Sequence, residues 1–424
     1  MVFILLYLSG TVTCNVVQIH TVADAGTRAA KLSLINLIPI FLGGGYEFGA
    51  RLLGTSLYTY GFVHRSFAVV AVLEAIVHII IVAQIRVISW SNELQFYGLL
   101  AASMFLALVL LPLVKKRVYE VFLITHLGCA MALIYAIWQH TRSAHERLWA
   151  FPVTYISIFA ITGALQLVRI FYRNMVIGRN PVRLILRPYV GDVARITLLL
   201  PRPWTVRAGE RINLGVPHVG IFYLAQSHPF AISWWEDDGR GRAVSISVLF
   251  RPRSGFTRKL LDRVEPNREC GAWIDGPFGP TRVNWSSAST VGDYGHIFMV
   301  ATGIGIAAQL PYIKELLDGH NKAQVCTQRI SLVWQLDRVG DWESARDWLQ
   351  VLVRQDNGYM LHVSVYDQLR SDSGNEIQRI GENGLIEVHS GRVNWEKQLD
   401  AEIESRIGKL LSLLGFKFGT ISGT

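Results

Sequence analysis

Acidic residues are almost absent from the first 172 positions of the chain, and this limits what that part can fold into. Only six of the 32 aspartates and glutamates lie there. They are Asp24, Glu47, Glu74, Glu93, Glu120 and Glu146. A segment with so few charges cannot cover a surface in water, whereas it suits hydrocarbon. We therefore expect a membrane domain over residues 1–172 and a water-soluble part after it.

Six apolar stretches in this part are candidates for membrane helices, since about 20 helical residues cross roughly 30 Å of hydrocarbon. They cover residues 1–19, 32–42, 62–85, 96–114, 121–139 and 149–171. The first could be a signal peptide, but no basic residue precedes its apolar run, so we favour a membrane helix. Its abrupt apolar start also suggests that N-terminal sequence is missing.

Basic residues indicate the orientation, because cytoplasmic loops carry an excess of lysine and arginine. Such residues follow the fourth stretch at 115–117 and the sixth at Arg169, Arg173 and Arg179. With six helices, both chain ends and the water-soluble part would face the cytosol. The formal net charge of +9 comes without an aromatic and basic binding motif, so we expect no nucleic acid to bind. The four cysteines have no CxxC spacing and predict neither a zinc site nor a disulfide framework.

Two patterns divide the water-soluble part. Short alternating runs such as 183–186, 194–198 and 243–248, separated by proline and glycine, predict an antiparallel β-barrel over residues 180–290. Over residues 291–424, strands at 297–301, 330–336 and 362–366 alternate with helical stretches at 307–317 and 342–353. This alternation is typical of an α/β domain with a parallel sheet.

Four histidines in the membrane domain share one spacing. His64 and His78 are 14 residues apart in one helix, and His126 and His140 are 14 apart in another. In a helix, 14 steps return to within ~40° of the same face about 21 Å further along. The two helices should run parallel, so that His64 pairs with His126 and His78 with His140. Two bis-imidazole levels suit two heme irons, whereas a single intramembrane histidine could simply hydrogen-bond to a neighbouring helix.

Glu74 lies one turn before His78 on the same face of the helix, where a carboxyl group in the membrane is costly. It either tunes the outer heme or stays protonated and hydrogen-bonded within the bundle.

The histidine pairs, together with His228-Pro229-Phe230, resemble the fungal ferric-chelate reductases, in the superfamily that includes NADPH oxidases. The resemblance covers about residues 28–395. It implies a multi-helix transmembrane heme bundle followed by a ferredoxin-reductase-like module. In that module an antiparallel β-barrel domain binds FAD and an α/β nucleotide-binding domain binds NADPH.

In that family a His-Pro-Phe-Thr segment after a barrel strand binds FAD. The corresponding residues here are His228, Pro229, Phe230, Ala231, Ile232 and Ser233. Ala231 replaces the usual hydroxyl residue, which removes one side-chain hydrogen bond and predicts weaker flavin binding.

Two glycine-containing segments resemble phosphate-binding elements of the family. Gly255, Phe256 and Thr257 resemble the element for the flavin pyrophosphate, although by themselves they are equally a helix cap with a basic face. Gly303, Ile304, Gly305 and Ile306 follow a predicted strand and precede a predicted helix. A backbone turn at such a place can approach the pyrophosphate of NADPH.

The C-terminal part departs from the family pattern. The Cys-Gly-Pro motif expected near the nicotinamide is absent, and residues 396–424 show a polar helical run without a convincing final strand. We expect an incomplete nicotinamide site, as in a truncated or alternatively spliced product, which puts hydride transfer in doubt.

The resemblance implies a ferric-chelate reductase of the plasma membrane, with possible iron-uptake partners. NADPH would reduce FAD on the cytosolic side, and electrons would pass through two b-type hemes (heme b) to ferric or cupric chelates outside. No catalytic side chain is assigned beyond the cofactors. One alternative is a superoxide-producing NADPH oxidase. Another is a catalytically incomplete protein that binds heme or flavin and regulates a partner.

Overall fold

The computed structural model describes most of the chain: residues 2–42, 45–87, 89–115, 117–142, 147–220, 226, 228–279, 291–368, 378–380 and 384–415. It forms two compact units, Met1–Leu167 and Val168–Thr424. Each unit has hydrophobic core residues of its own.

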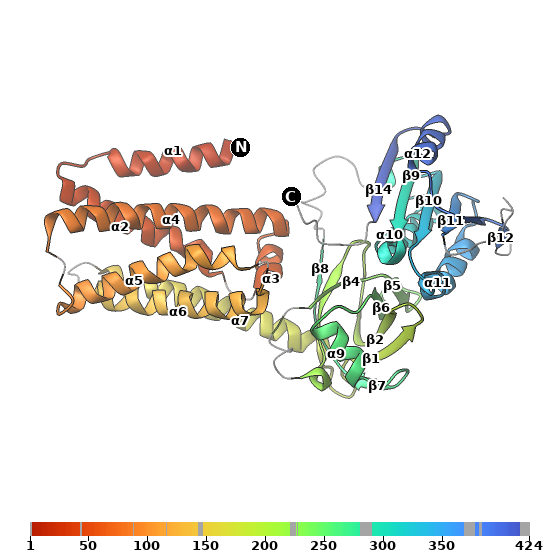
Figure 1. The fold of residues 1–424 in the computed structure, drawn as a ribbon, viewed down its shortest axis with the longest axis horizontal. Helices are drawn as coiled ribbons and strands as arrows, with labels where there is room; N and C mark the ends of the chain where they lie inside the picture. Colours follow the sequence, from red (N-terminus) through yellow and green to blue (C-terminus); the bar gives the residue numbers. More distant parts are fainter. Residues whose placement is uncertain are drawn as a thin grey trace. The chain divides into compact units, whose positions relative to one another are not determined.

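Helices account for the regular structure described in the first unit (Figure 1). They are α1 (Val2–Val16), α2 (Val22–Leu37), α3 (Gly45–Leu52), α4 (Leu57–Ile85), α5 (Glu93–Leu110), α6 (Tyr119–Arg142) and α7 (Ala150–Asn174), with the short 3-10 turns η1 (Ile38–Phe41), η2 (Leu111–Leu113) and η3 (Arg147–Trp149). By length and composition, four spans in the described residues can cross a membrane. They are Leu57–Ile85, Glu93–Leu113, Val121–Arg142 and Arg147–Asn174.

The first two expected spans differ from the prediction. Helix α1 has 15 residues and α2 has 16, so both are shorter than the other four. The predicted stretch 32–42 is wrong in its bounds, because α2 begins at Val22 and stops at Leu37. Thr21 starts it with a capping box, in which the Thr21 side chain accepts from the Asp24 backbone and the Asp24 side chain accepts from the Thr21 backbone.

The helices of the first unit pack in pairs. Helix α4 lies along α2, and α6 lies along α5, whereas α4 and α6 are not among the closely packed pairs of described helices. Residues from four of these elements, including Leu34, Ala71, Leu133 and Tyr155, share one buried cluster. The Tyr155 hydroxyl donates to the Leu34 carbonyl at 2.6 Å, which ties α7 to α2.

The second unit begins with two antiparallel sheets that form the predicted barrel. One has the order β5-β6-β2-β1-β7 and the other β4-β3-β8. Their strands are β1 (Arg183–Tyr189), β2 (Val193–Trp204), β3 (Arg211–Gly215), β4 (Pro229–Ala231), β5 (Trp234–Asp237), β6 (Ala243–Phe250), β7 (Glu269–Gly271) and β8 (Trp273–Phe278), and helix α9 (Phe256–Arg263) follows β6. Alternate residues of β1 and β2, such as Leu184, Leu186, Ile196 and Leu198, fill the core.

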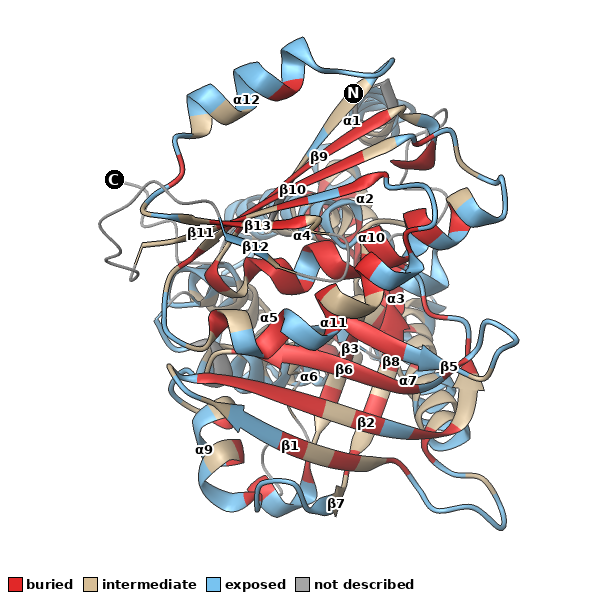
Figure 2. Cartoon of the chain, turned by 90° about the vertical axis from the view of Figure 1, so that its right-hand side faces the viewer, coloured by how far each residue is buried: buried red, intermediate tan, exposed pale blue. Residues whose placement is uncertain are grey.

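A six-stranded sheet with the order β12-β13-β11-β10-β9-β14 forms the rest of the second unit, and its central strands are mostly buried (Figure 2). Its strands are β9 (His296–Thr302), β10 (Arg329–Leu336), β11 (Leu361–Asp367), β12 (Gln378–Ile380), β13 (Ile386–Ser390) and β14 (Leu410–Gly415). Its helices are α10 (Ile306–Asn321), α11 (Asp341–Gln355) and α12 (Trp395–Glu404). All its pairings are parallel except that of β12 with β13. The predicted alternation of strands and helices is confirmed.

Aromatic and cationic side chains join the barrel to this sheet. The Trp234 ring of β5 stacks on Trp348 of α11 at 5.7 Å, and the Lys314 ammonium lies 4.3 Å from the Trp234 ring centre. The Arg195 guanidinium lies 3.7 Å from the Trp348 ring and bonds both oxygens of Asp347. Burial lowers the pKa of the Lys314 ammonium, whose Nζ donates to the Trp235 carbonyl.

The prediction that the chain lacks a final strand is wrong. Leu410–Gly415 form β14, which pairs in parallel with β9 over its whole length, from Leu410 opposite His296 to Gly415 opposite Ala301. The leucine-rich run shows no clear alternation of apolar and polar residues. It forms a strand because it pairs with the open edge of β9, and not because of its local pattern.

A buried polar cluster fastens α12 to the sheet. The His296 Nε2 atom lies 2.9 Å from Glu402 Oε2 and 3.1 Å from Ser331 Oγ, and the Ser331 hydroxyl donates to Glu402 at 2.8 Å. Arg329 Nη2 lies 3.5 Å from the same carboxylate oxygen. Burial lowers the pKa of the His296 imidazole more than the Glu402 carboxylate raises it, and the cation of Arg329 also lowers it.

We expect the α/β domain that contains β9 to lose stability as the pH falls. Since the folded pKa of His296 lies below its ordinary value of 6.5, the unfolded chain binds the proton more tightly. The stabilisation is therefore complete above about pH 6.5 and is lost progressively below it. The melting temperature of the full chain should therefore fall from pH 7 to pH 5.

His296→Gln should flatten this pH dependence, and His218→Gln, at an exposed position, should leave it unchanged. Equal pH slopes for wild type and His296→Gln would contradict the assignment.

Candidate functional site

Two of the predicted histidines meet between α4 and α6. The ring centroids of His64 and His126 are 6.5 Å apart, with an angle of 50° between the planes. First-row metal ions bind imidazole nitrogen at about 2.0–2.1 Å, so one ion shared by two rings would hold their centroids roughly 6 Å apart. Rotation of either ring about the metal–nitrogen axis leaves that distance unchanged. The spacing therefore fits one metal centre with two axial imidazoles.

The other two histidines are held by backbone carbonyls. The His78 Nδ1 atom lies 2.9 Å from the Gly26 carbonyl oxygen of α2, and the His140 Nδ1 atom lies 2.7 Å from the Leu94 carbonyl oxygen of α5. An Nδ1–H that donates to a carbonyl leaves Nε2 as the ring atom with a lone pair.

Glycine gives the His140 ring its space. A Cβ placed at Gly98 of α5 would lie 3.0 Å from His140 Cε1 and 3.1 Å from its Nδ1. A side chain at position 98 would therefore displace the ring.

The histidine pairs suit a metal ion whose other ligands come from a prosthetic group and not from the protein. Among the described residues, no cluster of three or more His, Cys, Asp or Glu could hold a metal ion. A heme needs only two axial ligands from the protein. The His126 Nδ1 atom is buried and has no hydrogen-bond partner among the described residues, so the ring is free to contact a bound group.

Glu74 is buried, and its Oε1 accepts from the Asn15 side chain of α1 at 2.5 Å. The structure therefore gives Glu74 a hydrogen bond within the bundle, as the second of the two interpretations expects.

The two predicted flavin segments lie together in the barrel unit. Strand β4 pairs with β3, and the His228 ring just before it stacks on Phe256, with centroids 3.9 Å apart and planes 6° from parallel. Phe230 contacts Phe250 edge-on at 5.7 Å and Phe256 at 6.3 Å. Residues 228–230 and 255–257, which are distant in sequence, therefore form one surface.

The side chains of these segments differ in their exposure to solvent. Ile232 and Ser233 are fully buried, and the Ser233 hydroxyl accepts from the Leu249 amide at 3.1 Å, so only their backbone could reach a flavin. Pro229 and Ala231 are exposed. Gly255 has φ +88°, a conformation that favours glycine, directly before α9.

Thr257 stabilises the turn before α9. Its hydroxyl accepts from the Arg253 amide at 2.8 Å. It stays half-buried at the start of the helix, where amide groups point outward.

The predicted nucleotide segment is a tight turn between β9 and α10. Gly303–Gly305 form the 3-10 turn η6, and Gly303 has φ +48°. A Cβ at Gly303 would overlap the Asp337 carboxylate. The Trp334 indole donates to the Gly303 carbonyl at 2.8 Å. Gly305 precedes α10, Ile304 is half-buried, and Ile306 is in the hydrophobic core.

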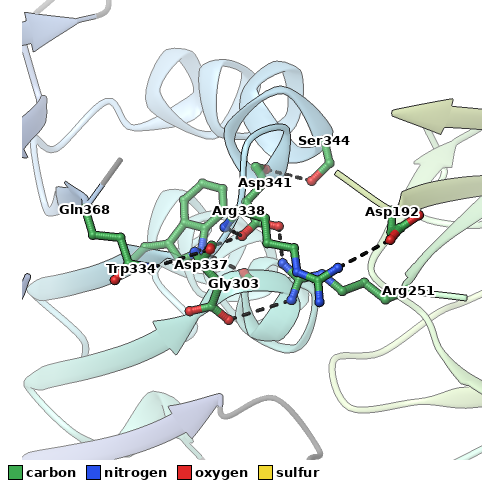
Figure 3. A network of polar contacts seen from close by, with 9 residues as sticks. All are labelled: Asp192, Arg251, Gly303, Trp334, Asp337, Arg338, Asp341, Ser344 and Gln368. Atoms are coloured by element: carbon green, nitrogen blue, oxygen red, sulfur yellow. Dashed lines mark hydrogen bonds and ion pairs between the residues drawn. The ribbon is translucent and has the colours of Figure 1, made fainter. Parts of the chain in front are cut away.

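An ionic network joins this turn to the barrel (Figure 3). The buried Arg251 guanidinium, which follows β6, lies 2.5 Å from Asp341 Oδ1 and 3.7 Å from Asp337 Oδ2. The other Asp341 oxygen accepts from the Asp337 and Arg338 amides at 2.9 and 3.0 Å. The segment that leads from β6 to Gly255 is thus connected to the turn that would hold the nucleotide.

Sequence reasoning missed Trp334, Asp337 and Asp341. A signal was present, because Asp337 directly follows a predicted strand, and the carboxyl ends of parallel strands share one edge of the sheet.

Comparisons with known proteins find similarity to ferric reductases. Residues 294–410 match the model of the ferric reductase NAD binding domain. The chain is 25% identical over 223 residues to the ferric/cupric reductase transmembrane component 2 of Saccharomyces cerevisiae, covering 52% of this chain and 28% of the yeast protein. It is 21% identical over 337 residues to the ferric reductase transmembrane component 1 of Schizosaccharomyces pombe, covering 67% and 55%. The chain is therefore similar to ferric reductases over part of its length.

The matched part of the chain spans less than a third of the first yeast protein and about half of the second. Among solved structures, a flavohemoglobin from Malassezia yamatoensis with bound FAD and heme aligns at 12% identity and a TM-score of 0.38, covering 93% of this chain and 99% of that one. The predicted fold class is confirmed: membrane-length helices precede a ferredoxin-reductase-like module with antiparallel sheets and a mostly parallel sheet.

Proposed function

We propose that the chain carries electrons across a membrane, from a reduced nicotinamide nucleotide through FAD and two b-type hemes to ferric or cupric chelates. The observation that carries the proposal is the 6.5 Å separation of the His64 and His126 rings, which fits one iron between them. The ferric reductase NAD binding domain at residues 294–410 supports the nucleotide as electron donor.

Each part of the chain has a distinct task in this proposal. Flavin converts a two-electron hydride donor into single electrons, and hemes with two axial imidazoles pass electrons on without binding oxygen. His64 and His126 would hold the inner iron, and His78 and His140 the outer one. The carbonyls of Gly26 and Leu94 would fix the orientation of the outer imidazoles.

The flavin and the nucleotide would bind to different parts of the second unit. FAD would bind the surface formed by residues 228–233 and 255–257, where the His228–Phe256 stack gives a flat apolar support. The nucleotide pyrophosphate would approach residues 303–306 at the start of α10. The resemblance implies NADPH, a plasma-membrane location, a cytosolic C-terminal half and a role in iron uptake.

The decisive experiment records the heme absorption of the purified full chain, loaded with heme and FAD, before and after nucleotide addition. We expect a bis-histidine spectrum that becomes reduced on addition of NADPH or NADH, followed by reoxidation with a ferric chelate. Superoxide without ferric reduction would instead indicate an NADPH oxidase. Normal heme spectra without nucleotide-dependent reduction would indicate a regulatory heme or flavin protein.

A further inference from the structure

Asp337, the residue directly after β10, lies against the turn at Gly303 that would hold a nucleotide. We infer that Asp337 makes the nucleotide site selective for NADH over NADPH. This inference rests on the proposed function, because it concerns the nucleotide that would bind beside Gly303.

Asp337 lies at the edge of the sheet where a nucleotide would bind. Strands β9 and β10 are parallel neighbours, with Thr302 opposite Gln335, so their carboxyl ends lie side by side. The turn at Gly303 continues β9, and Asp337 is the first residue after β10. In such βαβ units, an acidic side chain after the second strand accepts from the ribose 2′-hydroxyl of NAD, whereas an arginine nearby accommodates the 2′-phosphate of NADP.

The sequence offers both kinds of residue, Asp337 and Arg338, and the structure separates them (Figure 3). The Asp337 carboxylate contacts the Gly303 turn, as the overlap with a Cβ at Gly303 shows. The Arg338 guanidinium is directed instead to Asp192, in the β1–β2 turn of the barrel, at 3.5 Å. The acid, and not the arginine, therefore faces the candidate nucleotide turn.

Backbone contacts hold Asp337 in this position. Its amide donates to Asp341 Oδ2 at 2.9 Å, and its carbonyl accepts from the Gln368 side chain at 3.4 Å. Its own side chain is one quarter exposed, so it stays accessible to a ligand.

The local charge disfavours a phosphate. Arg251 is shared by two carboxylates and lies closer to Asp341, at 2.5 Å, than to Asp337, at 3.7 Å. The negative charge of Asp337 is therefore only partly compensated by Arg251. NADH and NADPH share the pyrophosphate, so this carboxylate distinguishes them only at the ribose 2′ position. There a phosphate monoester adds about −1.5 to −2 charges at pH 7 and would be repelled, whereas a hydroxyl could donate to the carboxylate.

The test measures binding of NAD⁺ and NADP⁺ to the purified full chain by calorimetry, so that no electron transfer is needed. We expect wild type to bind NAD⁺ at least about tenfold more tightly than NADP⁺. Asp337→Ser should remove or reverse this preference, and Asp337→Asn should reduce it. The matched control Arg338→Ala should keep the wild-type ratio.

Two results would overturn the inference in different ways. Tighter binding of NADP⁺ by wild type, with loss of that preference in Arg338→Ala, would reverse the assignment and leave the proposed function intact. Binding of neither nucleotide would reject both the inference and the proposed role of the α/β domain.

Discussion

Replacing Asp341 by alanine should lower the melting temperature of the second unit by roughly 10 °C. Asp341 is 1% exposed, and its two oxygens accept from Arg251 and from two backbone amides. Removing one partner of a buried ion pair costs about 3–5 kcal/mol, because the remaining charge stays buried without compensation. For a domain of this size, 1 kcal/mol corresponds to about 2–4 °C. Tryptophan fluorescence during heating of the full chain in detergent would measure the change.

The same helix supplies a control. Glu343 of α11 forms an exposed ion pair with Arg346 at 3.5 Å, and such pairs contribute about 0–1 kcal/mol. Glu343→Ala should therefore change the melting temperature by no more than a few degrees. Asp341→Asn keeps one acceptor oxygen and should fall between the two. If Asp341→Ala melted together with Glu343→Ala, the network in Figure 3 would not hold the barrel to the sheet.

The local pattern of apolar and polar residues was sufficient to predict those strands and helices that do not depend on a distant part of the chain. The strands at 297–301 and 330–336 and the helix at 342–353 are apolar segments buried in the sheet or against it, and their observed bounds agree within two residues. Helix α2 was misplaced because Asp24, Arg28 and Lys31 interrupt its apolar character, while the capping box that starts it is a weaker signal. Strand β14 depends on the edge of β9, more than a hundred residues earlier.

In the candidate site, too, local spacing was predictable from the sequence, whereas contacts between distant residues were not. The interval of 14 residues predicts two histidine positions on one face of each helix, because helix geometry determines that spacing, and the structure brings His64 and His126 together. The carbonyls that hold His78 and His140 come from Gly26 and Leu94, on other helices, and no local pattern shows them. The pairing of Arg251 with Asp341 likewise joins residues 90 positions apart.

Replacing His140 by glutamine should reduce the heme content of the full chain from two per chain to one. Glutamine has no imidazole nitrogen for the iron, so the outer level loses one of its two axial ligands, while His64 and His126 remain in place. Heme extracted from a known amount of protein, together with its reduced spectrum, would measure the ratio. The control is His20→Gln, at an exposed position between α1 and α2, which should retain two hemes.

A second variant separates the ligand from its surroundings. Gly98→Val leaves all four histidines in the chain, but its side chain would occupy the space of the His140 ring, which a Cβ alone already approaches at 3.0 Å. Because the ring would then turn away from its bond to the Leu94 carbonyl, we expect the same loss of one heme. Two hemes in both His140→Gln and Gly98→Val would show that His140 is no ligand. Loss in His140→Gln alone would show that the ring tolerates displacement and that the carbonyl contact is dispensable.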